Sequence, residues 1–167
     1  MKIQIRNMNA SDYIKVEEIY LEGIKTKCAT FQTEAPSFEQ WDASHLKECR
    51  LVAVEEKEGL VIGWAALSPI SSRCVYRGVC EMSIYIAECA RGQHVGFELI
   101  NEMIRQSEKC GIWTLQSAIF QVNEASIALH KKCGFREVGI RERIAKDQDG
   151  KWQNTVLMER RSSVVGL

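Results

Sequence analysis

The apolar positions of this chain follow two different periods, and these periods predict its elements. Short apolar or alternating runs are typical of β-strands, and spacings of three and four residues are typical of amphipathic helices. Strands are predicted at residues 3–8, 51–55, 60–67, 79–86, 113–120, 135–144 and 152–158. Helices are predicted at residues 12–23, 37–49 and 95–109, with a short fourth helix before Gly134. This order predicts an α/β domain in which helices cover both faces of one mixed sheet.

Polar residues are concentrated on one face of the short fourth helix. Asn123 is a good N-cap residue, and Gly134 stands where a left-handed residue would end the helix. Asn123, Ser126 and His130 are spaced three and four residues apart, so they share a face. An amide, a hydroxyl and an imidazole on one helix face indicate a wall that binds a ligand.

A second candidate site lies between the strand at 79–86 and the helix at 95–109. The connecting loop contains Arg91, Gly92, Gln93, His94, Val95 and Gly96. A strand, a glycine-containing loop and a helix N-terminus together present main-chain N–H groups to a phosphate. The sequence therefore predicts an anion-binding loop here.

Length and charge narrow the class of protein. A chain of 167 residues is expected to form one domain with a substantial core. Its 22 basic and 22 acidic residues give no net charge, which does not indicate a nucleic-acid-binding surface. No apolar run approaches the roughly 20 residues of a membrane span, and residues 1–6 lack the apolar core of a signal peptide. We therefore expect a cytoplasmic protein with neither a nucleic-acid nor a membrane partner.

The cysteines do not indicate disulfides or a metal. There are seven, an odd number, and they are scattered without a C-x-x-C pair or zinc-site spacing. Reduced thiols are the expected state, and no metal site is expected.

The two candidate segments together resemble the GNAT acetyltransferases. In that family an Arg/Gln-x-x-Gly-x-Gly/Ala loop holds the coenzyme A pyrophosphate, and an Asn-x-x-Ser-x-x-x-Tyr/His helix flanks the pantetheine. The resemblance covers essentially the whole chain. It implies a single GNAT domain over residues 1–167, with a mostly antiparallel mixed sheet of about seven strands. It also implies acetyl-CoA as co-substrate, with no metal.

Three further segments resemble the phosphinothricin and methionine-sulfoximine branch of that family. They are residues 29–36 followed by Trp41, residues 72–77, and residues 150–152. The resemblance implies N-acetylation of a small amino acid or analogue, and a homodimer by analogy. Two alternatives remain: a protein N-terminal acetyltransferase, or a non-catalytic coenzyme A-binding regulatory module. The main support for the module is His94, because the family usually has Gly at that position.

For the coenzyme, the resemblance implies a mostly main-chain site. The loop from Arg91 to Gly96 would hold the pyrophosphate, and Asn123 and Ser126 would face the pantetheine. The main-chain N–H groups of Ile84, Tyr85 and Ile86 would polarise the thioester carbonyl. His94 has two interpretations. Histidine tolerates the left-handed conformation, so the loop could keep its shape, or the substitution could weaken coenzyme binding.

Catalysis is assigned to two side chains. Glu81 interrupts an apolar strand and is the candidate base; otherwise it is a solvent-facing carboxylate or a partner of Arg77. His130 is the candidate acid, because an imidazole titrates near neutral pH; otherwise it is a structural histidine near the helix end.

The remaining predicted residues would bind the amine substrate. Arg73 and Arg77 could bind a carboxylate or phosphinate with their guanidinium groups. Phe31, Tyr76 and Trp152 could enclose the side chain of the substrate, although core packing is the usual fate of aromatic residues.

Overall fold

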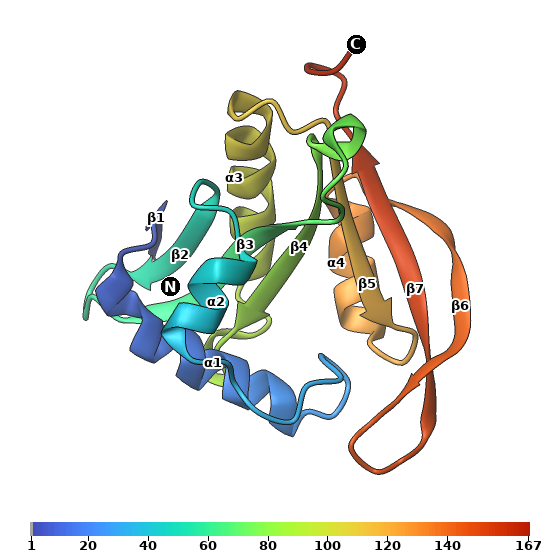
Figure 1. The fold of residues 1–167 in the computed structure, drawn as a ribbon. Helices are drawn as coiled ribbons and strands as arrows, with labels where there is room; N and C mark the ends of the chain where they lie inside the picture. Colours follow the sequence, from blue (N-terminus) through green and yellow to red (C-terminus); the bar gives the residue numbers. More distant parts are fainter. Residues whose placement is uncertain (1) are drawn as a thin grey trace.

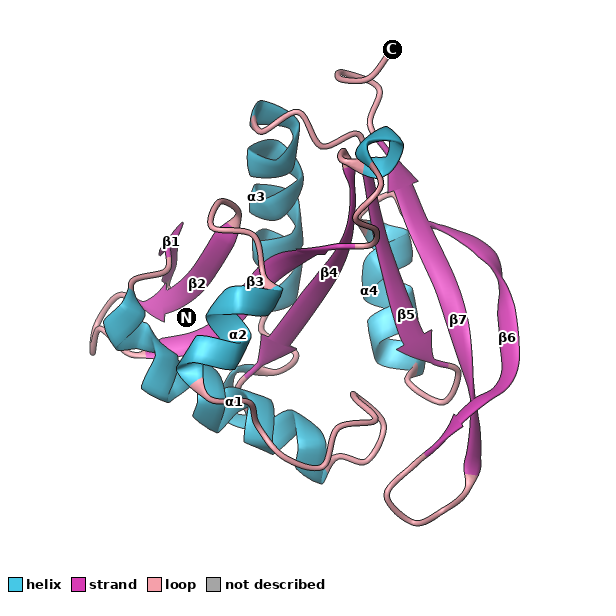
Figure 2. Ribbon diagram, in the orientation of Figure 1, coloured by secondary structure: helices cyan, strands magenta, loops and turns pink. Residues whose placement is uncertain are grey.

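The protein, seen here in a computed structural model that describes residues 2–167, forms one seven-stranded sheet with four α-helices (Figures 1 and 2). The strands are β1 (Ile3–Asn7), β2 (Arg50–Glu55), β3 (Val61–Pro69), β4 (Val79–Ile86), β5 (Thr114–Phe120), β6 (Arg136–Lys146) and β7 (Trp152–Arg161). The helices are α1 (Tyr13–Lys25), α2 (Phe38–Ser44), α3 (Val95–Lys109) and α4 (Glu124–Lys132). Every predicted element is present, in the predicted order.

The sheet has the strand order β1-β2-β3-β4-β5-β7-β6. All neighbouring strands are antiparallel except β4 and β5, which are parallel. The single parallel pair lies at the centre of the sheet, where α3 provides the crossover connection. The mixed sheet that the pattern predicted, and its mostly antiparallel character, which the family resemblance implied, are thereby confirmed.

Helices cover both faces of the sheet. Tyr85 and Ile86 are consecutive in β4 and therefore point to opposite faces. A Cβ atom at Gly23 of α1 would lie 2.7 Å from the Tyr85 ring, and one at Gly96 of α3 would lie 3.7 Å from Ile86. Helix α1 thus packs on one face of β4 and α3 on the other.

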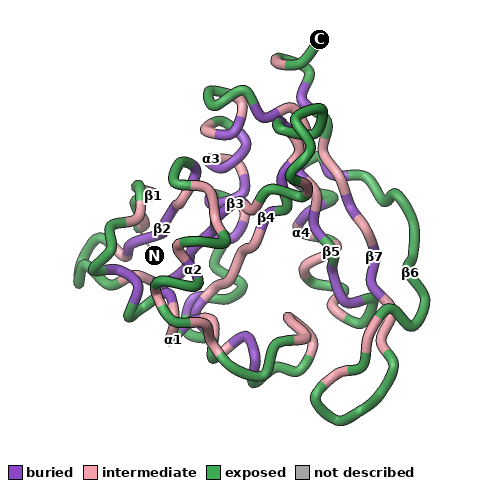
Figure 3. The backbone as a smooth tube through the Cα atoms, in the orientation of Figure 1, coloured by how far each residue is buried: buried purple, intermediate pink, exposed green. Residues whose placement is uncertain are grey.

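The core lies between these layers. Leu99, Ile100 and Met103 form the buried stripe of α3, and Val16 and Ile19 form that of α1. Both stripes follow the helical spacing read from the sequence. Strand β6 is different, because all but one of its residues are exposed (Figure 3).

The second helix is shorter than predicted. Its start is confirmed: Ser37 accepts from the Gln40 N–H, and Gln40 accepts from the Ser37 N–H, as in a capping box. Its end is wrong, because α2 stops at Ser44 and not near Cys49. The Arg50 guanidinium donates to main-chain carbonyls of Asp42, His45 and Leu46. A side chain from β2 therefore satisfies carbonyls at which the helix ends.

The cysteine prediction is confirmed, because all seven are free thiols. Burial raises the pKa of the Cys80 thiol to about 11, so this cysteine beside Glu81 is not poised as a nucleophile.

Candidate functional site

The central feature of the site is a gap between β4 and β5. The two strands pair through only three residue pairs, and Glu81 with Gln116 is the last. Both strands continue beyond that point, β4 to Ile86 and β5 to Phe120, without pairing to each other. The sheet therefore opens into a V at its centre.

The direction of the main-chain groups in β4 follows from its pairing with β3. Ala87 donates its N–H to Ile62, so the alternation of the ladder turns the Tyr85 N–H toward β3 as well. The N–H groups of Ile84 and Ile86 then point into the V. This differs from the sequence expectation for Tyr85, whose N–H belongs to the ladder while its side chain faces the α1 side.

The predicted anion-binding loop has the shape that phosphate binding requires. His94 lies immediately before α3 with φ 66° and ψ 3°, a left-handed conformation, which confirms that histidine can take the place of glycine here. Gly92 is also left-handed, with φ 74°. Among the described residues, the main-chain N–H groups of 92–96 donate to no main-chain carbonyl outside the helix. They sit at the positive end of the α3 dipole.

Gly96, at the start of α3, lies at the contact between α3 and α4. A Cβ atom there would lie 2.8 Å from Cδ2 of Leu129 in α4, which is too close for an unadjusted contact. The glycine therefore lets α3 and α4 approach each other behind the V. Arg91 folds back from the loop, and its Nε donates to the Ile86 carbonyl over 3.3 Å.

Asn123 ties α4 to the first loop of the chain. Its Oδ1 accepts from the Ser126 N–H at 3.2 Å, which is the predicted N-cap, and its Nδ2 donates to the Cys28 carbonyl at 3.2 Å. Asn123 and Ser126 both line the cavity described below. The amide thus fixes the distance between α4 and the loop that follows α1.

His130 is buried and engaged at both ring nitrogens. Its Nδ1 lies 2.8 Å from the Ser126 carbonyl, and its Nε2 lies 3.1 Å from the Ser117 hydroxyl. Ser117 also lies 3.3 Å from the Met82 carbonyl, just beyond the last pair of β4 and β5. Burial lowers the pKa of His130, which favours the neutral ring. The geometry places His130 as a residue that positions β5 against β4; its role as proton donor stays a prediction.

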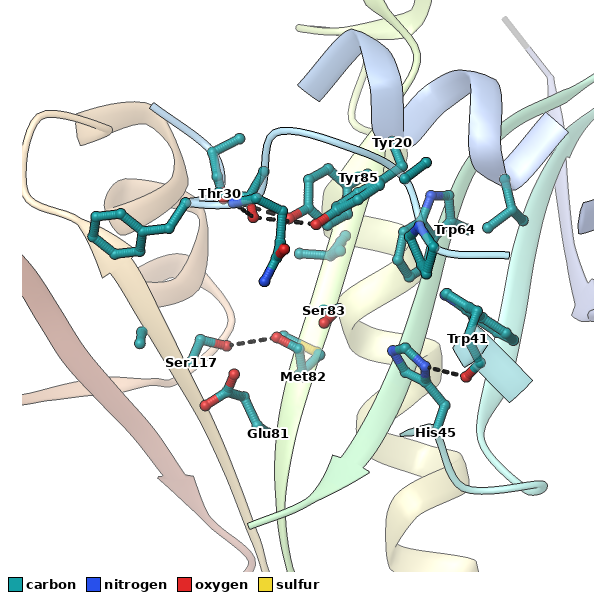
Figure 4. Close-up of a pocket in the computed structure, with 18 of the residues that line it drawn as sticks. Tyr20, Thr30, Trp41, His45, Trp64, Glu81, Met82, Ser83, Tyr85 and Ser117 are labelled. Atoms are coloured by element: carbon teal, nitrogen blue, oxygen red, sulfur yellow. Dashed lines mark hydrogen bonds between the residues drawn. The ribbon is translucent and has the colours of Figure 1, made fainter. Parts of the chain in front are cut away.

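A cavity of about 740 Å³ runs through the V and under the loop between α1 and α2. It is lined from both sides of the gap by β4 and β5 residues, by the polar face of α4, and by aromatic residues of α1, α2 and β3 (Figure 4). Trp64 and Tyr85 stack with ring centroids 5.0 Å apart, and Tyr20 packs edge-on against Tyr85 at 4.8 Å. These rings form a rigid apolar floor.

Glu81 and Phe31 lie in this cavity, as predicted. No hydrogen bond or ion pair joins the Glu81 carboxylate to another described residue, so it is available to a ligand. Arg77 is not its partner: the guanidinium lies over the Trp113 ring, 5.9 Å from the ring centroid. Phe31 packs on Phe120 with a centroid distance of 4.3 Å.

Four residues predicted to bind the amine substrate do not line the cavity. Arg73 lies over the Tyr76 ring at 5.4 Å, and both are in the turn that precedes β4, at the closed end of the V. Arg77 is beside them. Trp152 is 57% exposed at the start of β7, where Lys146 covers its ring. For Arg73, Tyr76 and Arg77, the path of the 70–78 turn depends on packing against Trp113, so the sequence alone could not place them relative to the cavity. Their role in substrate binding stays a prediction.

The charged residues that do line the cavity are all acidic. They are Glu17, Glu34 and Glu81, and no Lys or Arg of the described chain joins them. His45 is the one cavity-lining histidine besides His130, and the sequence reading passed over it because it belongs to no motif. A lining with these charges favours binding of a positively charged amine over binding of an anion.

Comparison with known proteins assigns the family. Residues 13–135 match the acetyltransferase (GNAT) family. The chain therefore belongs to that family, and it is an acetyltransferase.

Several relatives carry names from one branch of the family. A Bacillus subtilis protein, provisionally assigned as a phosphinothricin acetyltransferase, is 33% identical over 91% of this chain and 94% of its own length. The phosphinothricin N-acetyltransferase of Alcaligenes faecalis is 31% identical over 93% of this chain and 81% of its own. A phosphinothricin acetyltransferase of Sinorhizobium meliloti, solved with acetyl-CoA, has a TM-score of 0.87 and 27% identity, covering 99% of this chain and 91% of that one.

The described residues contain neither a candidate metal site nor a candidate membrane-spanning helix. Residues 2–167 contain no group of three or more His, Cys, Asp or Glu placed to hold a metal ion. Over the same range, no helix combines the length and the apolar character that crossing a membrane would require.

Proposed function

We propose that this protein transfers the acetyl group of acetyl-CoA to the amine of a small amino acid or analogue, of the phosphinothricin or methionine-sulfoximine type. The observation that carries the proposal is the V between β4 and β5, with two free N–H groups on one arm and an unpaired carboxylate at its apex. The names of the relatives support the choice of substrate.

The residues present fit acetyl-CoA. Ile84 and Asn123 line the cavity, and Ile86 and the 92–96 loop follow Ile84 along the chain. Together they are called here the coenzyme half of the site, which offers N–H groups to a pyrophosphate and a carbonyl. When bound, acetyl-CoA supplies an activated acetyl group as a thioester. The N–H groups of Ile84 and Ile86 stabilise negative charge on a carbonyl oxygen placed in the V.

The part of the cavity bordered by Glu81, His45, Phe31 and Trp64, called here the amine half, receives the second substrate. Glu81 takes a proton from the ammonium group, directly or through one water, and leaves a neutral nitrogen with its lone pair free. Because the described residues of the lining include carboxylates and no Lys or Arg, the amine end enters first and the carboxylate end of the substrate stays toward the mouth.

The experiment is a substrate panel. Acetyl-CoA is mixed with the protein and with phosphinothricin, methionine sulfoximine, methionine sulfone, other free amino acids, or a peptide with a free N-terminus. Released thiol is then measured. We expect the sulfoximine and phosphinothricin class to give the highest kcat/KM. Release only with the peptide would favour an N-terminal acetyltransferase, and binding of acetyl-CoA without release from any amine would favour a regulatory module.

We also propose that the protein acts in the cytoplasm as a homodimer and as one domain. Strand β6 supports the dimer: it is an exposed sheet edge, and Val138, Ile140 and Ile144 are each 45–51% exposed. An exposed apolar edge is a surface that a second chain can cover. Light scattering of the purified protein tests this, with Ile140→Lys expected to shift the mass to that of a monomer.

A further inference from the structure

His45 occupies the amine half of the cavity and has no role in the assignments above. It follows the last residue of α2 and lies among aromatic rings. Its ring stacks on Trp41 with centroids 4.4 Å apart and packs edge-on to Trp64 at 6.4 Å. The imidazole is half-buried and held in one orientation, as a binding residue must be.

The hydrogen bonds of His45 fix its tautomer. Nδ1 lies 2.7 Å from the Trp41 carbonyl oxygen, which can only accept, so Nδ1 carries the proton. The Ser44 hydroxyl is 3.0 Å from the same nitrogen and 3.0 Å from the same carbonyl. In the neutral ring Nε2 is then an unprotonated acceptor.

That acceptor is directed into the cavity. Figure 4 shows Nδ1 turned to Trp41, with the opposite edge of the ring facing the side of Ser83 and Met82. No described residue makes a hydrogen bond to Nε2. A half-buried ring nitrogen without a protein partner, beside a carboxylate-lined cavity, is a group prepared for a ligand.

The surroundings keep His45 neutral. Burial lowers its pKa, the Trp41 carbonyl opposes the shift, and the charge of Arg50 lowers the pKa further. The charged and titratable groups around it are Arg50 on β2, Asp42 on α2, Tyr13 and Glu17 on α1, Glu34 on the loop, and Glu81 and Tyr85 on β4. These effects favour the neutral ring, whose Nε2 accepts a hydrogen bond.

We propose that His45 is a specificity-determining residue, whose Nε2 accepts a hydrogen bond from the ammonium group of the substrate and holds it within reach of Glu81. This inference rests on the proposed function. No bond forms or breaks at His45, since Glu81 takes the proton. The ligand class is a primary ammonium with at least one N–H to donate besides the one lost to the base.

The test compares two substitutions whose side-chain amides reach the positions of different ring nitrogens of His45. His45→Asn places a donor near the Nδ1 position and removes the acceptor in the cavity, whereas His45→Gln reaches the Nε2 position with an amide oxygen. The amine of the panel that gives the highest thiol release is used as probe. We expect His45→Asn to raise the KM for that amine about 10- to 100-fold, the usual loss for a hydrogen bond to a charged group. The KM for acetyl-CoA should not change.

The other arms separate binding from structure. His45→Gln should recover most of the affinity for the amine, and Lys47→Ala, in the same loop but outside the cavity, should leave both KM values unchanged. Between pH 7.5 and 5.5 the KM for the amine should rise more in the native protein than in His45→Gln, because a protonated ring repels an ammonium group. The free-amine fraction falls equally in both proteins and cancels in this ratio.

The possible outcomes are distinct. Thiol release from no amine overturns the proposed function itself. Normal release with an unchanged amine KM in His45→Asn overturns the inference about His45 alone. A loss of kcat with no change in KM, uncorrected in His45→Gln, also overturns it, because it would make His45 the base. If His45→Asn does not fold, the pH comparison of native protein and His45→Gln decides the question.

Discussion

In the coenzyme half of the site the groups offered to a ligand are main-chain atoms, whereas in the amine half they are side chains. Ile84, Ile86 and the 92–96 loop present N–H groups whose direction follows from the ladder and the helix start. Glu81, His45 and Phe31 present a carboxylate, an imidazole and a ring. Substitution can therefore alter the amine half one residue at a time, while the coenzyme half changes only if the backbone moves.

The sharpest test of the amine half is Glu81→Gln, which keeps the size of the side chain and removes the base. We expect turnover to fall by about 10²–10⁴-fold with acetyl-CoA binding intact. The loss should shrink at high pH, where more amine is already unprotonated. Thiol release against pH measures this, with Glu58→Gln in the exposed turn between β2 and β3 as control. Near-normal turnover would remove Glu81 as base, and an equal loss at every pH would make it a binding carboxylate.

The boundary between the halves is tested by His130→Ala. His130 is 1% exposed and links Ser117 of β5 to α4, so removing the ring leaves a void and unpaired polar groups. A loss of roughly 2–5 kcal/mol in the free energy of unfolding is expected from urea titration. Lys131→Ala, next to it but paired on the surface with Glu137, should cost less than about 1 kcal/mol. Equal losses in the two variants would contradict the positioning role.

Lowering the pH should reduce the stability that His130 contributes to the folded protein. Because the pKa of His130 is lower in the folded protein than the ordinary value of 6.5, the unfolded chain takes up this proton first as pH falls. Stability from this group is complete above pH 6.5 and is lost as pH falls through the folded pKa. His45 adds to the loss in the same direction. Thermal midpoints between pH 7.5 and 5.5 should fall less steeply in His130→Gln, and an unchanged slope would contradict the assignment.

Asn123 connects both halves through its two amide atoms. Asn123→Ala should cost about 0.5–2 kcal/mol of stability through the lost cap, and about 0.5–1.5 kcal/mol of acetyl-CoA affinity if the amide also contacts the pantetheine. Asn123→Asp keeps the cap oxygen, loses the donor to the Cys28 carbonyl and adds a negative charge beside it. Calorimetry separates the two effects. An unchanged dissociation constant in Asn123→Ala would exclude Asn123 from the coenzyme site.

The smallest effect is expected from His94→Gly in the coenzyme half. If main-chain N–H groups bind the pyrophosphate, glycine should keep or slightly improve acetyl-CoA affinity, because it adopts φ 66° without steric cost. A calorimetric titration measures this. A clear loss of affinity would show that the imidazole itself contacts the coenzyme, and would weaken the contrast between the two halves.

The same contrast explains how much the sequence could predict. The order of elements, the Ser37 capping box and the left-handed His94 depend on local patterns and were predictable. The end of α2 was not, because it is set by the Arg50 side chain from β2. The position of Arg73 and Arg77 outside the cavity was not predictable either, because their turn packs against Trp113. His45 has no motif, and its free nitrogen is known only from the Trp41 contact.

The V has a further consequence for how this sheet exchanges hydrogen with water. From Met82 onward, β4 is central in strand order and yet has the unpaired groups of an outer strand. The amide hydrogens of Ile84 and Ile86 should therefore exchange rapidly with deuterium in the free protein, while that of Tyr85 between them stays protected by β3. Acetyl-CoA bound in the V should slow the exchange of these two amide hydrogens, so their exchange rates report how much of the protein has the coenzyme bound.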